Sequence, residues 1–326
     1  MITDADWDRY TLEGFLPLGQ VAEPAQLRAL CQRADDLALG QHVNPGVQMQ
    51  LDTGGAYAEL PDAVARFDSG TLGYRKIQGL EHDDVFLPLI RHPLFRAIAG
   101  RVYGEHAPVS IFRAMIMNKP AGQGTHLPWH QDGGDVWKLD HDPLVTIWVA
   151  IDDATTQNGC MDVVPGSHRH GMLSLFGSTV REDHVAMHCT PDRIRPLEVP
   201  AGHAVLLHNW LLHRSGVNRT QAPRRAFTMV CMDGRTRSTL TGQPFPMIWG
   251  EAATADYPYV EQLRTERDTH AVSFREAERY ALSLRQENEA LHGAMAEATR
   301  YAHSLEAELA RQRAAAAAPR RWWRRA

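Results

Sequence analysis

The sequence predicts a mainly β fold, an antiparallel barrel or double-sheet jelly roll, with helices before it and a long helical tail after it. From about residue 108 onward, short apolar runs alternate with turn residues, and no helical segment separates them. Two amphipathic segments precede these runs. Between residues 259 and 318 the chain is rich in Ala, Glu, Arg and Leu and has no proline. We therefore predict two domains, 1–255 and 256–326.

The elements follow from spacing and turn chemistry. Residues 24–39 carry apolar residues at helical spacing with Pro24 near the start, and a second helix is expected around 93–102. Glycine, proline and asparagine turns separate the apolar runs that we predict as strands. The predicted strands are 109–117, 144–151, 160–165, 203–213 and 224–232.

Composition excludes several classes of protein. The 326 residues are 44% hydrophobic and 22% charged, which excludes a wholly disordered chain, a collagen and a disulfide miniprotein. No apolar run reaches the roughly 18 residues that span a bilayer, and the net charge of −5 argues against nucleic-acid binding. The acidic N-terminus predicts no secretory signal. The four cysteines form no CxxC pair and are expected to be reduced thiols, so we expect a cytoplasmic protein.

Seventeen histidines make any single one uninformative, so spacing has to select the candidates. The segment 127–134 contains His130-x-Asp132, and on a strand the two side chains lie on one face while Gln131 points away. An imidazole and a carboxylate that converge in this way supply two ligands to one metal ion. Two histidines and one carboxylate on one side of a metal are typical of non-haem Fe(II) oxygenases.

A later segment supplies partners for this motif. A histidine late on the apolar run 203–213 would close the triad. An arginine on the following strand would then hold a carboxylate of a co-substrate through a bidentate pair.

The ordered motifs from about residue 110 to 235 resemble the phytanoyl-CoA dioxygenase family of Fe(II)/2-oxoglutarate oxygenases. Three of them, in order, form a specific joint pattern: His-x-Asp, Asn-Gly-x(5)-Pro-Gly-Ser-His and His-x-Ser-x(8)-Arg. The resemblance implies a double-stranded β-helix core, also called a jelly-roll or cupin-like core, and it does not cover the tail. The matching pieces are Met115–Pro120, Trp129–Asp132, Trp148, Asn158–Met161, Pro165–His168, His213–Ser215 and Arg224.

The resemblance also implies a role for each matching residue. His130, Asp132 and His213 correspond to the iron ligands, and Arg224 to the partner of the distal carboxylate of 2-oxoglutarate. Ser215 would support that carboxylate. Two further residues would line its pocket, namely Trp148 and Met115.

The implied activity uses Fe(II), 2-oxoglutarate and O₂ to hydroxylate an unactivated C–H bond, with release of succinate and CO₂. The carboxylate of Asp132 favours hydroxylation, because halogenating relatives need a small residue there. The substrate is expected to be a small or carrier-linked molecule. Two alternatives remain open at this point: a non-catalytic interaction protein of the same fold, and a Zn-dependent hydrolase that uses the same three ligands.

Neighbouring residues have simpler interpretations. His208 is expected to be a structural histidine on the opposite strand face from His213, and Arg225 to form a salt bridge on the face away from Arg224. The turn 165–168 is expected to border the active-site pocket. Trp137 fits a core position as well as a wall of the substrate site.

The tail contains a repeat, since Tyr280–Leu284 recurs as Tyr301–Leu305 after 21 residues, or three heptads. One register places apolar residues at positions a and d of a coiled coil, with Asn288 at a, which favours self-association. A single helix folded back on the barrel is the alternative. The basic, tryptophan-containing end, 319–326, suits a membrane interface or an anionic partner, or is a frayed terminus without a role.

Deletion of residues 260–326 should leave the barrel folded and 2-oxoglutarate decarboxylation largely unchanged, but lower the oligomeric state. The reason is that an a/d seam needs a partner helix to bury it. Light scattering of the full chain and the truncated chain measures this. An equal number of chains per particle in the two samples contradicts the prediction.

Overall fold

The computed structural model describes residues 2–174, 178–250 and scattered positions between 293 and 311. The chain divides into two compact units, Met1–Ala271 and Val272–Ala326. The first unit is mainly β and contains two antiparallel sheets. The boundary predicted at residues 255 and 256 lies outside the described residues. Within the described ranges, no helix combines the length and apolar character that a membrane crossing requires.

Seven strands form the path of the larger sheet, and β13 (Met247–Trp249) joins it by pairing with β4. In spatial order the path is β1 (Phe15–Gln20), β10 (His203–Leu207), β6 (Val145–Ala150), β12 (Arg224–Asp233), β4 (Val109–Lys119), β3 (Tyr74–Gln78) and β2 (Gln48–Leu51). The smaller sheet runs β8 (Ser178–Thr179), β5 (Leu127–Gln131), β11 (His213–Ser215), β7 (Met161–Val163) and β9 (Arg195–Leu197).

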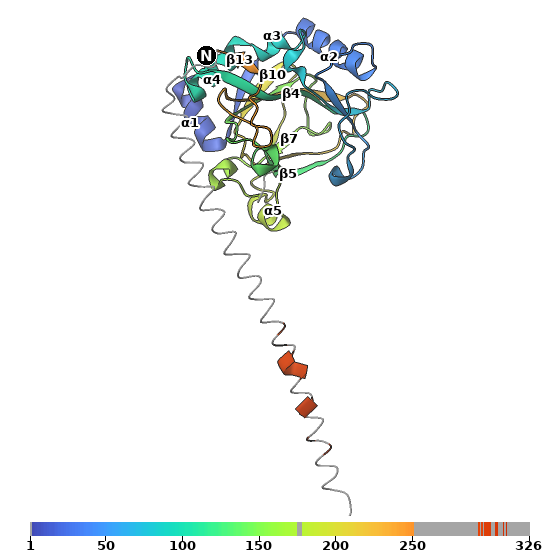
Figure 1. Ribbon diagram of the computed structural model, residues 1–326, viewed down its shortest axis with the longest axis vertical. Helices are drawn as coiled ribbons and strands as arrows, with labels where there is room; N and C mark the ends of the chain where they lie inside the picture. The colour runs from blue at the N-terminus through green and yellow to red at the C-terminus, as the bar shows by residue number, and fades with distance from the viewer. Residues whose placement is uncertain are drawn as a thin grey trace, which may run out of the picture. The chain divides into compact units, whose positions relative to one another are not determined.

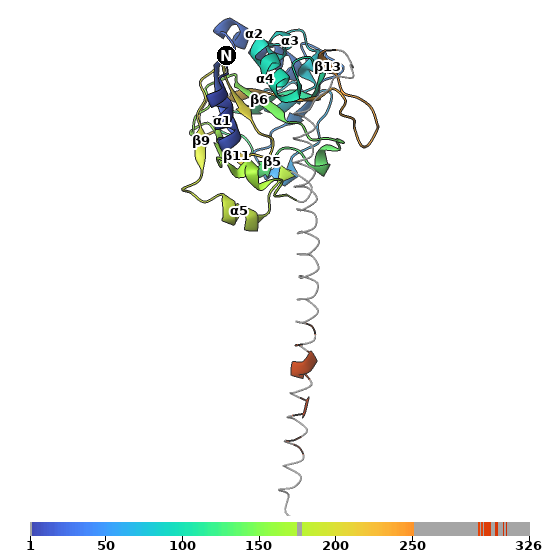
Figure 2. The same cartoon turned by 90° about the vertical axis from the view of Figure 1, so that its left-hand side faces the viewer.

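Helices α2, α3 and α4 lie together over the larger sheet, and the short helix α5 lies at one end of the smaller sheet (Figures 1 and 2). In the sequence, α1 to α4 come before β4, and α5 lies between β8 and β9. The α-helices are α1 (Asp4–Glu13), α2 (Pro24–Ala38), α3 (Leu87–Ile90), α4 (Pro93–Tyr103) and α5 (Glu182–His188). The 3₁₀ turns are η1 (Tyr57–Glu59), η2 (Leu80–His82), η3 (Asp135–Trp137) and η4 (Ser167–His170).

Local sequence explains where the first helices begin. Helix α1 starts at a capping box, in which Thr3 and Asp6 each accept a hydrogen bond from the other's backbone amide. Helix α2 has Pro24 in its first turn, a position where the missing amide costs nothing, and it buries one apolar face. Both helices predicted from the sequence are confirmed, as α2 and α4.

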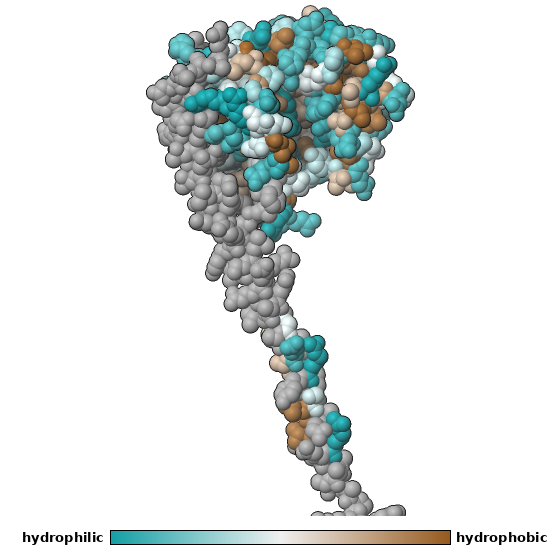
Figure 3. Space-filling view, in the orientation of Figure 1, coloured by the Kyte–Doolittle hydropathy of each residue, from teal (hydrophilic) through white to brown (hydrophobic). Residues whose placement is uncertain are grey.

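Three apolar clusters organise the first unit. The largest lies between the helices and the outer face of the larger sheet, a second contains residues of both sheets, such as Trp148 and Val163, and a third packs behind the smaller sheet around Trp129 and Leu212. On the face seen in Figure 3, polar residues dominate and apolar residues occur in small separate groups. Each of the two sheets therefore has an apolar cluster on both of its faces.

The predicted strands are confirmed with one correction. Residues 109–117, 144–151, 160–165 and 224–232 correspond to β4, β6, β7 and β12. The run 203–213 is not one strand: β10 ends at Leu207 in the larger sheet, and β11 begins at His213 in the smaller sheet. The intervening residues cross between the sheets, and the backbone amide of His208 donates to the carbonyl of Gly14 at 2.8 Å. Apolar character alone does not reveal this crossing, because the residues on both sides of it are buried.

In the second unit, the described residues between 293 and 311 are helical. Three positions of the predicted seam, Met295, Leu305 and Leu309, are exposed in the single chain. Most other seam positions and the basic end 319–326 lie outside the described residues. Coiled-coil pairing therefore stays a prediction.

Candidate metal and co-substrate site

The fold brings two histidines and one aspartate together in a cavity between the sheets. His130 on β5 and His213 on β11 are directly paired across neighbouring antiparallel strands, and their ring centres lie 3.9 Å apart. Asp132 follows β5 by one residue. Ligand atoms of the three side chains all lie within 4.8 Å of one another. Such a cluster has the size and composition of a 2-His-1-carboxylate metal site.

Backbone carbonyls orient both imidazoles in the same way. Nδ1 of His130 lies 2.9 Å from the carbonyl of Pro128, and Nδ1 of His213 lies 2.9 Å from the carbonyl of Leu211. A carbonyl only accepts hydrogen bonds, so each Nδ1 carries a proton, and Nε2 is the nitrogen that each imidazole can offer to a metal. Burial lowers the pKa of His130 well below its usual value, and the neighbouring His213 lowers it further. The neutral form that binds a metal is therefore favoured.

Gln131 lies between His130 and Asp132 in the sequence, and its side chain anchors β5 on the face away from the metal-ligand cluster. Its side-chain amide donates to the carbonyls of Gly171 and Trp210 at 2.8 and 2.7 Å, and its carbonyl accepts from the amide of Leu173 at 2.6 Å. The side chain is fully buried. The sequence prediction that Gln131 points away from His130 and Asp132 is confirmed.

The variant Gln131→Leu should lose about 2–4 kcal/mol of unfolding free energy, because three backbone groups, two of them buried, lose their partners. Urea unfolding followed by circular dichroism measures the change. Gln41→Leu is the matched control, since Gln41 is exposed and its replacement should change stability by no more than about 0.5 kcal/mol. Equal stability of the two variants contradicts the anchoring role.

The triad lines a cavity of about 70 Å³. Three neighbouring strands contribute one residue each to its wall. Thr228 on β12 pairs with Met115 on β4 on one side and with Trp148 on β6 on the other. Ser215 on β11 lines the same cavity. The structure thus brings every predicted site residue to one cavity. The full lining is Met115, Met117, Leu127, His130, Asp132, Thr146, Trp148, Met161, Leu207, His213, Arg214, Ser215, Arg224 and Thr228.

Arg224 is a buried cation at this cavity. Its Nη2 donates to the carbonyl of Gly159 at 2.8 Å, its Nε is buried without a hydrogen-bond partner, and its guanidinium carbon lies 6.0 Å from the centre of the Trp148 ring. Burial lowers the pKa of Arg224 to about 10. No carboxylate of the described residues forms an ion pair with it. A buried guanidinium in this state is poised to receive an anion.

Gly159 allows this arrangement through its backbone. Its φ is +79°, and a Cβ there would lie 2.6 Å from the carbonyl oxygen of Gly216 and 3.0 Å from the side chain of Lys119. Glycine is therefore required in the Asn158-Gly159 turn. The close approach brings the carbonyl of Gly159 to Arg224.

Arg225 lies on the other face of β12, as strand alternation predicts. It forms two short contacts with Asp152, from Nε at 2.8 Å and from Nη2 at 3.0 Å, and a longer one with Asp35 on α2 at 3.6 Å. The predicted salt bridge of Arg225 is confirmed.

Sequence reasoning did not find the residues that support Asp132. Its backbone amide donates to the carbonyl of Asn209 at 2.8 Å, and the Asn209 side chain accepts from Thr146 at 3.0 Å. Thr228 was also missed, and its hydroxyl is buried in the cavity wall without a partner. These residues belong to no local motif. The register of the larger sheet identifies Thr146 and Thr228, and the crossing between β10 and β11 places Asn209.

A basic and aromatic cluster flanks the triad. The guanidinium carbon of Arg113 lies 4.3 Å from the ring centre of Phe112 and 4.8 Å from that of Trp137. Burial lowers the pKa of Arg113, while the charge of Asp132 opposes that change. Trp137 is half-buried, stacks on Phe112 at 4.7 Å and belongs to none of the three apolar clusters. This placement favours the wall over the core for Trp137.

His208 has a structural role. The ring of His208 packs on those of His168 and Tyr10, and its Nδ1 accepts from the amide of Trp210 at 3.0 Å. His208 is therefore structural as predicted, although it lies between strands and not on a strand face.

The prediction for the turn 165–168 is wrong: none of its residues lines the triad cavity, and Pro165, Gly166 and Ser167 line a separate pocket. The cause is that the turn follows β7 toward the outer side of the smaller sheet.

The donor set and the cavity fit a divalent metal ion with an anionic co-substrate. Two imidazoles and one carboxylate leave coordination positions open for further ligands, and Nε of Arg224, which has no hydrogen-bond partner among the described residues, lies in the same cavity. The fold and the site define a non-haem metal oxygenase of the double-stranded β-helix class.

The phytanoyl-CoA dioxygenase family model matches residues 10–226. The chain belongs to this family, and it is an Fe(II)/2-oxoglutarate-dependent dioxygenase. Among similar proteins, L-proline trans-4-hydroxylase of Streptomyces griseoviridis is 28% identical over 246 residues, which are 68% of this chain and 83% of the relative. Phytanoyl-CoA dioxygenase domain-containing protein 1 of Danio rerio is 25% identical and covers 72% of this chain and 91% of its own.

Solved structures share the fold. The non-haem α-ketoglutarate-dependent carbocyclase SnoK of nogalamycin biosynthesis has a TM-score of 0.56 at 19% identity and covers 76% of this chain and 94% of its own. EctD from S. alaskensis, solved with 2-oxoglutarate and 5-hydroxyectoine, has a TM-score of 0.52 at 19% identity and covers 77% and 86%. At this identity the likeness concerns the architecture alone.

Proposed function

We propose that this enzyme hydroxylates an unactivated C–H bond of a small or carrier-linked substrate and converts 2-oxoglutarate to succinate and CO₂. The single observation that carries the proposal is the shared cavity: His130, Asp132 and His213 lie in it together with a buried Arg224 that has no carboxylate partner among the described residues. A metal triad alone is compatible with other reactions. A triad beside a desolvated guanidinium supports a co-substrate that carries a carboxylate.

Bound Fe(II) supplies the O₂ chemistry, in which one oxygen atom enters the substrate as hydroxyl and the other enters succinate. The chain's residues bind and orient. His130, Asp132 and His213 hold the metal. Arg224 holds the distal carboxylate of 2-oxoglutarate, Ser215 adds a hydroxyl donor, and Trp148 with Met115 restricts the position of the carbon chain.

The alternatives leave features of the cavity unused. A Zn-dependent hydrolase needs three ligands and a water, but it gives the buried Arg224 and Ser215 no task. A non-catalytic protein of the same fold has no need for an intact ligand set whose imidazoles are oriented by backbone carbonyls. Both alternatives are therefore less well supported than the oxygenase.

The substrate site is proposed to lie on the side of the triad where Arg113 and Trp137 stand. Phe112 and Trp137 offer aromatic surface, and Arg113 offers a positive charge. The name of the streptomycete relative gives L-proline as its substrate, which supports a small polar substrate here. We propose that the reaction takes place in the cytoplasm.

The test is a reaction of the purified full chain with Fe(II), ascorbate and 2-oxoglutarate against a fractionated metabolite extract. Succinate release and a mass gain of one oxygen in one metabolite are expected, and both should disappear with a chelator. Succinate release that does not depend on iron rejects the oxygenase. A mass change other than one added oxygen rejects hydroxylation while keeping the class.

A further inference from the structure

A second pocket of about 320 Å³ lies apart from the triad cavity. The two pockets share no lining residue. The second pocket is bounded by the turn that contains η4, by the end of α5 and by the segment before β9. Its lining is Val164, Pro165, Gly166, Ser167, Arg169, His170, His188 and Arg193.

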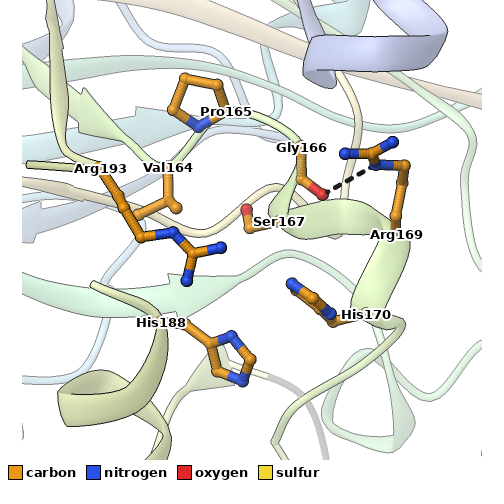
Figure 4. Close-up of a pocket in the computed structure, with 8 residues that line it drawn as sticks. All are labelled: Val164, Pro165, Gly166, Ser167, Arg169, His170, His188 and Arg193. Atoms are coloured by element: carbon orange, nitrogen blue, oxygen red, sulfur yellow. Dashed lines mark hydrogen bonds between the residues drawn. The ribbon is translucent and has the colours of Figure 1, made fainter. Parts of the chain in front are cut away.

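Among the residues that the structure describes, four basic side chains line this pocket and no acidic one does. Figure 4 shows Arg193, His170 and His188 turned toward one another across the hollow, while Arg169 folds back toward the carbonyl of Gly166. The ring centres of His170 and His188 lie 4.6 Å apart. No carboxylate of the described residues pairs with Arg169 or Arg193, although Glu13 and Asp183 pair with other arginines nearby. The pocket therefore holds positive charge without a counter-ion.

Burial and the neighbouring positive charges lower the pKa of both histidines in the pocket. Burial lowers the pKa of His170, and Arg193 and Arg169 lower it further. Burial also lowers the pKa of His188, with contributions from His170, His184 and Arg193. Each imidazole still offers one N–H donor when neutral. A cation is repelled by the two guanidinium groups, whereas an anion is attracted and meets donors from three directions.

Backbone contacts hold the frame of the pocket. The hydroxyl oxygen of Ser167 accepts from the amide of Leu212 at 2.9 Å, and the amide of Gly166 donates to the carbonyl of Glu13 at 2.8 Å. The first bond ties η4 to the residue before β11, and the second ties it to the end of α1. The donors on η4 are therefore held between α1 and the smaller sheet.

We propose that this pocket binds the phosphoryl group of a small phosphorylated molecule. A tetrahedral phosphate presents oxygens in three directions, toward Arg193, His170 and His188, whereas a planar carboxylate presents only two. The pocket, at about 320 Å³, is large enough for a phosphate group and part of the molecule that carries it. Guanidinium groups bind phosphate through strong charge-assisted hydrogen bonds.

The test is calorimetric titration of the full chain, loaded with Fe(II) under argon and saturated with 2-oxoglutarate so that the Arg224 cavity is filled. The probes are inorganic phosphate, glycerol 3-phosphate and vesicles that contain phosphatidic acid. One saturable site for both soluble probes is expected, with the ester at least as tight as the ion. Binding to vesicles alone contradicts a pocket for small molecules and indicates a surface for lipid.

Variants assign the binding to this pocket. Arg193→Gln and His188→Gln should each weaken phosphate binding about tenfold or more, with the 2-oxoglutarate affinity unchanged. Arg195→Gln is the matched control, because Arg195 lies two residues away, is half-exposed and pairs with Glu13. The proposal is overturned if phosphate shows no saturable binding up to a concentration of about 10 mM, which would detect even a weak site. An equal loss of phosphate affinity in Arg195→Gln and Arg193→Gln overturns it as well.

Discussion

Replacement of Asp132 by alanine is expected to abolish iron-dependent consumption of 2-oxoglutarate while the fold stays intact. The side chain of Asp132 contributes one of three ligand atoms that lie within 4.8 Å of one another. His130 and His213 alone leave the metal without its only anionic protein ligand in the cluster. The fold should tolerate the change, because the backbone amide of residue 132 keeps its bond to the carbonyl of Asn209.

The measurement combines Fe(II) binding, succinate release and thermal unfolding. Asp135→Ala is the matched control, since Asp135 is exposed three residues further along and the variant loses the same charge. The control should keep activity near that of the parent chain. Full turnover by Asp132→Ala without added carboxylate contradicts the assignment of Asp132 as an iron ligand.

The motifs of the site could be predicted because each depends on local geometry. Alternation on a strand separates His130 from Gln131 and Arg224 from Arg225, and the structure places these pairs on opposite sides. A turn such as Asn158-Gly159 needs a positive φ, which sequence indicates directly. The mainly β architecture follows from apolar runs with turn residues between them.

Other features depend on contacts between distant segments, and the sequence does not contain a local signal for them. The crossing from β10 to β11 lies inside one apolar run, because the residues on either side of it are buried in different sheets. The same holds for Thr228, which joins the cavity wall only through the register of β12 with its neighbours. One missed element had a signal: the pair Thr3 and Asp6 is a capping box and marks the start of α1.

Replacement of Arg224 by alanine should raise the Kd for 2-oxoglutarate far more than replacement of Arg225. The Arg224 guanidinium is buried, with a carbonyl as its only hydrogen-bond acceptor among the described residues. Removing one partner of a buried charge pair typically costs about 3–5 kcal/mol, which is roughly a hundredfold or more in Kd. Arg224→Lys should recover part of this loss, since an ammonium supplies the charge without the planar fork.

Arg225 is the matched control because it carries the same charge one residue away. Its partners are Asp152 and Asp35 on the outer face of the sheet, so Arg225→Ala should lose about 1–3 kcal/mol of stability and little affinity for 2-oxoglutarate. Titration of both alanine variants with 2-oxoglutarate, beside urea unfolding of each, separates the two effects. A larger loss of affinity in Arg225→Ala would mean that the co-substrate lies on the opposite face of β12, and Arg224 would then need another anion to account for its burial.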